Sequence, residues 1–237
     1  MATVVDAPIL VLKAQDLAHT LLRNLPERWQ HSAGVAQRAE QLTGTVSNPA
    51  DAATLIAAAW LHDIGYAEDV RDTGFHPLDG GLYLRHRRWP NRIASLVAHH
   101  SEALCVASVR GLADRLAGFT REDTAVADAL TYADQTVGPH GRTMTIERCL
   151  DDMLRRHGPD SPNAQAHSRR APLLRAAGRR VEQRLSTSTS TPLALGSRSG
   201  AGSAAGWTPA RDDSYSESGL GPCPMLPSSG RAVHCGG

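Results

Sequence analysis

A histidine and an aspartate stand side by side, as His62 and Asp63, at the end of an apolar, alanine-rich segment. Apolar residues from Leu55 to Leu61 would face every side of a helix, which is the pattern of a buried helix. A buried carboxylate is costly unless a partner compensates its charge. The C-terminal end of a helix also favours a cation, because it is the negative end of the helix dipole. The pair therefore predicts a compensating positive charge nearby.

Three further segments place a side chain that can bind a metal on an otherwise apolar helical stripe. These side chains are His31, His100 and Asp134, which share their stripes with apolar residues at intervals of three and four. Each has an ordinary alternative, since a core histidine is usually hydrogen bonded and Asp134 could cap a helix or pair with an arginine. Together, these histidines and carboxylates need a common explanation. A metal centre supplies one, because it neutralises carboxylates and uses imidazole lone pairs.

Helices are the elements that must position these side chains. From residue 8 to residue 185, apolar residues recur at helical intervals, and few alternating β-branched runs occur. Asn48 before Pro49 and His76 before Pro77 are typical of helix starts. The sequence therefore predicts an all-α bundle of about seven or eight helices. The expected helices span residues 8–23, 26–42, 49–63, 77–88, 91–105, 122–137, 143–157 and 171–185.

The composition of the chain changes near residue 185. From Ser186 onward Ser, Gly, Thr and Pro dominate, and such a segment buries too little apolar surface to offset the chain entropy lost on folding. We therefore expect a helical domain over residues 1–185 and a disordered C-terminal tail over residues 186–237.

Composition also bears on location and partners. The net charge of +1 gives no basic field that would indicate nucleic acid. No apolar run approaches the roughly 20 residues that span a bilayer, and the N-terminal segment lacks a signal-peptide pattern. The 4 cysteines show no spacing typical of a metal site. We expect a cytoplasmic protein with reduced thiols and no membrane partner, and the oligomeric state stays open.

The order of the candidate residues resembles the H…HD…D pattern of the HD superfamily of metal-dependent phosphohydrolases. His31 supplies the first member, His62 and Asp63 the doublet, and Asp134 the last. His62 to Gly65 reads HDIG, a common form of the motif, and the resemblance covers roughly residues 25–157. It implies a helical bundle around a metal site, with His62 and Asp63 as catalytic residues. The implied activity is hydrolysis of a phosphomonoester or phosphodiester, often in a nucleotide, by attack of a metal-bound hydroxide.

Extra histidines follow the doublet, as in two-metal members of the superfamily such as the HD-GYP phosphodiesterases and the diadenosine tetraphosphate hydrolases. The resemblance thus implies one or two divalent transition-metal ions, of Mn, Fe, Co, Ni or Zn, with Asp63 as the natural bridge. His76 could instead cap its helix. One of His99 and His100 could lie outside the ligand set, because adjacent helical residues point about 100° apart. The candidate ligands are His31, His62, Asp63, His76, His99, His100 and Asp134.

The chain departs from the superfamily pattern in several places. Tyr66 follows HDIG where many members have Lys. The 5′-deoxynucleotidases of the superfamily have an acidic residue close after the doublet, whereas the first one here is Glu68. The GYP signature is absent, which argues against hydrolysis of cyclic di-GMP.

A basic cluster between residues 85 and 92 could supply phosphate contacts, and Arg85 and Arg88 are its candidate substrate-binding residues. Its alternative is a solvated basic surface. The sequence thus predicts a phosphohydrolase acting on a small phosphorylated molecule, with a nucleotide as the favoured substrate. The alternatives are a di-iron oxygenase on the same scaffold and a non-catalytic nucleotide-binding regulatory module.

Overall fold

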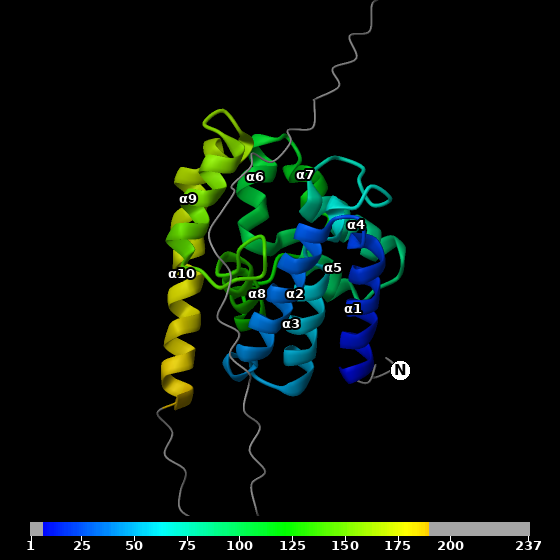
Figure 1. Ribbon diagram of the computed structural model, residues 1–237, viewed down its shortest axis with the longest axis vertical. Helices are drawn as coiled ribbons and strands as arrows, with labels where there is room; N and C mark the ends of the chain where they lie inside the picture. Colours follow the sequence, from blue (N-terminus) through cyan, green and yellow to red (C-terminus); the bar gives the residue numbers. More distant parts are fainter. Residues whose placement is uncertain (1–6, 190–237) are drawn as a thin grey trace, which may run out of the picture. The chain divides into compact units, whose positions relative to one another are not determined.

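The computed structural model describes residues 7–189, in which the regular elements are helices (Figure 1). No β-strand forms within this range, and an isolated bridge joins Val137 to Thr143. The predicted all-α helical bundle is therefore confirmed. The α-helices are α1 (Ala7–Leu22), α2 (Pro26–Gln41), α3 (Pro49–Leu61), α4 (His76–His86), α5 (Asn91–His99), α6 (Ala103–Val109), α7 (Ala113–Leu116), α8 (Ala125–Gln135), α9 (Ile146–His157) and α10 (Pro162–Thr189). Short 3₁₀ helices are η1 (Thr43–Thr45), η2 (Ile64–Tyr66) and η3 (His100–Glu102).

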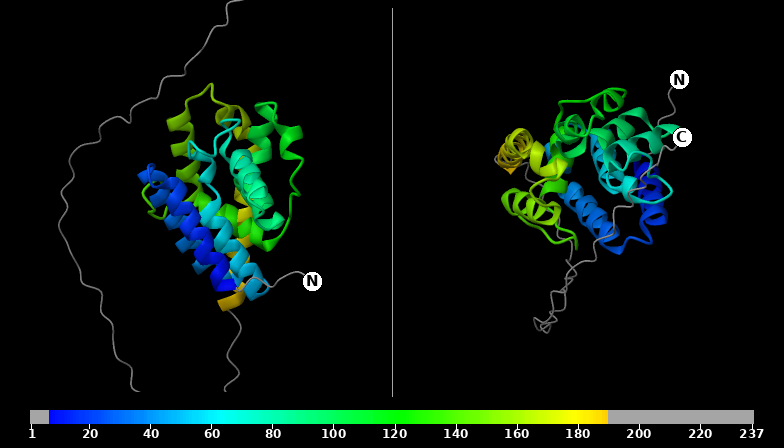
Figure 2. Two further views of the ribbon diagram at one scale, coloured as in Figure 1. Left: turned by 90° about the vertical axis from the view of Figure 1, so that its right-hand side faces the viewer. Right: turned by 90° about the horizontal axis from the view of Figure 1, so that it is seen from above.

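Helix α3 forms the centre of the bundle and packs against α1, α2, α5 and α8 (Figures 1 and 2). Asn48 caps its start by accepting a hydrogen bond from the backbone N–H of Asp51. Ala57, Ala58 and Ala59 are fully buried, and their small side chains let the neighbouring helices approach closely. The sequence pattern places apolar residues on every side of this helix, and the structure packs these sides against neighbouring helices.

A close backbone approach fixes the geometry just after α3. Gly65 lies in η2, and a Cβ atom at this position would overlap the backbone of His76, the first residue of α4. Only glycine therefore lets η2 and the start of α4 pack this closely. In the same way, Gly81 packs against Ala98 of α5, where an added Cβ would lie 2.8 Å from the Ala98 Cβ. These contacts bring α4 and α5 beside the end of α3.

One expected helix is broken in the structure. The pattern predicts a continuous helix over residues 91–105, but α5 ends at His99 and α6 begins at Ala103. Ser101 and Glu102 adopt left-handed backbone angles, with φ of 50° and 56°, which L-residues rarely adopt. This reversal turns the chain directly after His100, a change that apolar periodicity does not reveal.

The last helix is longer than expected. Helix α10 begins at Pro162, passes through Pro172 and continues to Thr189, whereas the sequence pattern predicts a helix over residues 171–185. Pro172 resembles a first-turn proline, but here it only removes one backbone donor within the helix. The helix thus passes the expected boundary at residue 185, and the predicted tail lies outside the described residues from residue 190 on. Among the helices of the described part, none is both long and apolar enough to span a bilayer.

Candidate metal centre

All of the candidate ligands except His99 converge beside the C-terminal end of α3. They come from separate helices, because His31 lies in α2, Asp134 in α8, and His62 and Asp63 directly after α3. His76 begins α4, and His100 follows α5. Residues more than 100 positions apart are thus neighbours, as in the 3.0 Å contact between His31 Nε2 and Asp134 Oδ1.

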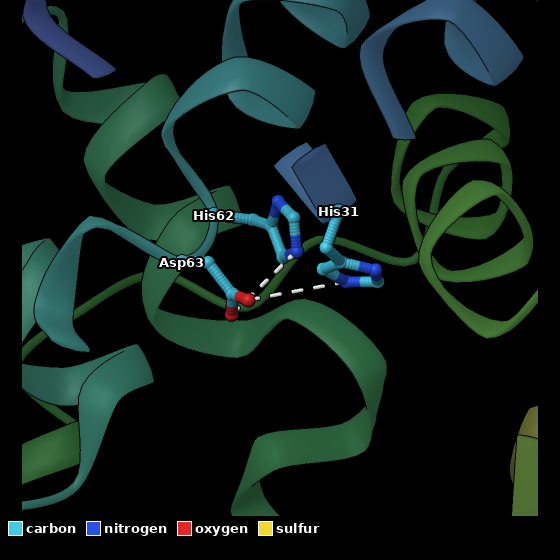
Figure 3. A group of neighbouring side chains, drawn as sticks. All are labelled: His31, His62 and Asp63. Carbon is cyan, nitrogen blue, oxygen red and sulfur yellow. Dashed lines mark ion pairs between the residues drawn. The ribbon is translucent and has the colours of Figure 1, made fainter. Parts of the chain in front are cut away.

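The first group of ligand atoms consists of two imidazoles and two carboxylates. His62 Nε2 lies 3.6 Å from Asp63 Oδ1 and 3.5 Å from Asp134 Oδ1. His31 Nε2 lies 3.9 Å from Asp63 Oδ2. Figure 3 shows the rings of His31 and His62 directed at the carboxylate of Asp63. This spacing suits one cation with several ligands.

The second group shares Asp63 with the first. His76 Nε2 lies 3.3 Å from Asp63 Oδ1 and also 3.3 Å from His100 Nε2. Asp63, His76 and His100 therefore offer three ligand atoms to one point in space. Because a carboxylate has two oxygens, Asp63 is placed to serve both groups.

The imidazole hydrogen bonds show which ring nitrogens are free to bind a metal. Nδ1 of His31, His62 and His100 contacts the carbonyl oxygens of Gly138, Ala59 and Val97, at 3.1, 2.8 and 2.7 Å. A carbonyl oxygen only accepts, so each Nδ1 carries a proton, and each ring in its neutral form would have its lone pair on Nε2. These Nε2 atoms face the carboxylates, which is the arrangement of metal-binding histidines.

One buried atom in this arrangement has no hydrogen-bond partner. His62 is fully buried, and its Nε2 makes no hydrogen bond to any residue in the described part of the chain. A buried polar atom without a partner is costly, and a metal ion would compensate that cost. The donor set of imidazoles and carboxylates suits a first-row transition metal better than Mg²⁺ or Ca²⁺. The residues therefore fit the metal centre that the sequence predicts.

Without a metal ion, the closely spaced histidines and carboxylates shift one another's pKa values. Burial opposes charge on His62, but Asp63 and Asp134 outweigh it and raise the pKa of His62 to about 9. Burial would raise the pKa of Asp63, but His62 and Arg28 hold it well below its usual range. The pKa of His100 falls to about 4, because of burial and the neighbouring His62. The carboxylates therefore stay ionised and attract cations.

Other side chains orient Asp134. Ser101 Oγ donates to Asp134 Oδ2, and Gln135 Nε2 donates to the same oxygen over 2.8 Å. These bonds occupy Oδ2 and leave Oδ1 facing His31 and His62. Sequence reasoning missed both partners. Gln135 is adjacent to Asp134, but the role of Ser101 depends on the left-handed turn, which leaves no signal in the sequence.

Tyr66 takes part in a stack beside the centre. Its ring lies parallel to that of His76, with centroids 4.1 Å apart. The guanidinium of Arg28 lies 4.0 Å from the centroid of the Tyr66 ring and also pairs with Asp63 Oδ2 at 3.2 Å. Arg28 stands three positions before His31 on α2, so helical spacing could have identified it.

His99 is placed elsewhere, so the ligand set must be corrected at this position. Its Nε2 donates to the carbonyl oxygen of Phe119 at 3.0 Å, and its ring belongs to neither group of ligand atoms. His99 is the last residue of α5, whereas His100 begins the turned segment that points inward. Of the adjacent pair, the structure favours His100.

The expected phosphate contacts also need correction. Arg85 donates to the carbonyl oxygen of Gly118 at 3.2 Å and stacks on Phe119, 4.3 Å from its centroid. Arg88 is exposed at the turn after α4. Neither side chain lines the cavity beside the metal centre. The structure thus places both side chains outside this cavity, at the protein surface.

A cavity of about 500 Å³ opens beside the candidate ligands. Its walls include His31, Asp63, His76, His100 and Asp134, so a molecule in it would touch the centre. Helices α9 and α10 contribute much of the remaining wall. The arginines that line it are Arg28, Arg110, Arg156 and Arg170.

Comparison with known proteins agrees with this geometry. Residues 28–136 match the family model of the HD domain, and this range includes every side chain that converges on the centre. No curated protein and no solved structure matches the chain significantly. Residues 28–136 therefore match an HD domain, and proteins with this domain are in general metal-dependent hydrolases.

Proposed function

We propose that this protein is a phosphohydrolase, which binds one or two divalent transition-metal ions and cleaves a phosphoester bond of a small molecule such as a nucleotide. The observation that carries the proposal is the buried Nε2 of His62, which has no hydrogen-bond partner within residues 7–189 and faces Asp63 and Asp134. Such an atom, beside two ionised carboxylates that themselves line a cavity, is suited to hold a catalytic metal ion.

The ligand groups assign a position to each ion. His31, His62, Asp63 and Asp134 would hold the first, and Asp63, His76 and His100 the second. When bound, such ions lower the pKa of water and neutralise charge on the phosphate. The backbone carbonyls accept hydrogen bonds from Nδ1–H and so keep each ring in the tautomer whose Nε2 can bind a metal.

The proposed reaction is hydrolysis. The oxygen of a water molecule forms a bond to phosphorus, and the ester P–O bond breaks. A proton from the water ends on the leaving oxygen, so the products are a phosphate and an alcohol. The cavity of about 500 Å³ falls within the range of roughly 300–1,000 Å³ for small-molecule sites. Its arginines would neutralise an anionic substrate.

The test is a panel of phosphomonoesters and phosphodiesters, assayed with the purified protein and with Mn²⁺, Co²⁺, Ni²⁺, Zn²⁺ or Fe²⁺. We expect phosphate release by the wild type and its loss, by at least about a thousandfold, in Asp63→Ala, because that change removes a ligand of both ions. Asp72→Ala is the matched control, since Asp72 is exposed and pairs only with Arg115 among the described residues.

Two results would overturn this proposal. One is an absence of hydrolysis with every ion. The other is oxygen consumption by an iron-loaded protein that leaves all the esters intact, because the di-iron oxygenases of the superfamily would use the same imidazoles and carboxylates. Equal activity in Asp63→Ala and Asp72→Ala would likewise contradict the assigned site.

A further inference from the structure

One wall of the cavity is strongly basic. Arg156 and His157 lie at the end of α9, Arg170 lies in α10, and Arg28 lies in α2, and all of them line the cavity. Burial and then the charges of the three arginines lower the pKa of His157. Like charges gathered at a cavity wall repel one another, so this arrangement favours a bound anion.

The acidic groups of the protein compensate this wall only in part. Arg156 pairs with Asp152 through its Nε at 2.8 Å, and Arg155 binds the other oxygen of the same carboxylate. Arg28 pairs with Asp63. Arg170 makes no ion pair with any described residue, and burial lowers its pKa. A partly buried guanidinium without an anionic partner keeps part of its desolvation cost, so Arg170 is the strongest candidate for a ligand contact.

A chain of hydrogen bonds connects Arg170 to the metal centre. Its Nε donates to the carbonyl oxygen of Ser101 at 2.8 Å, and Ser101 Oγ donates to Asp134. The Arg170 side chain lines the cavity, and its other guanidinium N–H groups make no hydrogen bond to residues 7–189. Arg170 is therefore fixed at one nitrogen, beside the place where the phosphoester would react.

We propose that Arg156 and Arg170 bind the phosphate of the substrate and make the enzyme selective for phosphomonoesters over phosphodiesters. The reason is charge: a phosphomonoester carries about −1.5 to −2 at pH 7, with three free oxygens, whereas a phosphodiester carries a single charge and two free oxygens. Arginines bind such oxygens through paired N–H groups. This inference rests on the proposed function. It assigns substrate selection to α9 and α10, outside the matched residues 28–136.

The test compares Arg156→Gln and Arg170→Gln with Arg85→Gln. Arg85 is the matched control because it also donates to a backbone carbonyl oxygen but does not line the cavity. Inorganic phosphate is titrated calorimetrically into each Mn²⁺-loaded protein. We expect each cavity variant to bind phosphate about tenfold more weakly or worse, and Arg85→Gln to stay within about twofold of the wild type. The metal content of each protein is measured alongside.

The kinetic arm uses 4-nitrophenyl phosphate and bis(4-nitrophenyl) phosphate. We expect kcat/KM for the monoester to fall at least about tenfold in both cavity variants, and for the diester to fall less than about threefold, because a diester offers fewer oxygens to the arginines. Arg156 has a half-exposed side chain, so its variant tests the proposal even where loss of the partly buried Arg170 lowers stability.

Unchanged phosphate binding in both cavity variants, at full metal content, would overturn this inference. Equal losses for the monoester and the diester would also overturn it. The proposed function is judged separately. Hydrolysis of both esters at the wild-type rate in all three variants refutes the arginine site alone. Phosphate binding through Arg156 and Arg170, in a protein that hydrolyses no ester, refutes the function and leaves the anion site standing.

Discussion

At the scale of single residues, the centre depends on which atom each side chain presents. His31, His62 and His100 all donate hydrogen bonds from Nδ1–H to backbone carbonyls, so their Nε2 atoms face the carboxylates. The residue types and their order could be predicted from the sequence, because polar side chains on apolar stripes are anomalous. The choice between His99 and His100 could not, since the left-handed turn at Ser101 decides it.

Ser101 provides a prediction at this scale. In Ser101→Ala, Asp134 loses the hydroxyl donor to its Oδ2 and keeps only the amide of Gln135. We expect Mn²⁺ to bind about tenfold more weakly, because partners that orient a ligand typically contribute 10- to 100-fold to metal affinity. Ser108→Ala is the control, since Ser108 Oγ is exposed and bonds to the carbonyl oxygen of Leu104. Competition with a fluorescent chelator measures both affinities, and equal values would show that Ser101 does not orient Asp134.

At the scale of elements, close packing determines where the ligands meet. Apolar periodicity and the Asn-Pro start predict α3 well, because those signals are local. The length of α10 and the break after α5 could not be predicted, since Pro172 resembles a helix start and Ser101 carries no sequence signal for a positive φ. The arginines of α9 and α10 join the cavity only through contacts between distant segments.

Gly65 tests the role of this packing. In Gly65→Ala the added Cβ would overlap the backbone of His76, so η2 and α4 must separate. We expect a loss of more than about 2 kcal/mol in the free energy of unfolding, as for other overpacked sites, together with weaker metal binding, since His76 moves away from Asp63. Gly44→Ala is the control, because no atom lies within 4 Å of a Cβ there. Urea unfolding of the two chelator-treated variants compares them, and similar midpoints would contradict the close-contact explanation.

At the scale of the whole molecule, two parts of the helical bundle contribute different side chains to the cavity. The matched HD segment, residues 28–136, contains all the converging histidines and carboxylates. Helices α9 and α10 follow it and close the cavity with basic side chains. The H…HD…D order of residues made the metal-binding part, residues 28–136, predictable from the sequence. The second part could not be predicted, because Arg156 and Arg170 lie on helices that give no sign of which residues face the cavity.

The metal content of the purified protein tests the central claim most directly. After loading with Mn²⁺ and removal of free ion, elemental analysis should give about two ions per chain for the wild type and about one for His76→Ala, since the first ligand group stays intact. Asp63→Ala should retain almost none, because it removes the shared ligand. His99→Ala is the matched control and should match the wild type, since His99 bonds to Phe119 outside both groups. A wild-type protein that retains no metal, or an Asp63→Ala variant with wild-type metal content, would contradict the metal centre.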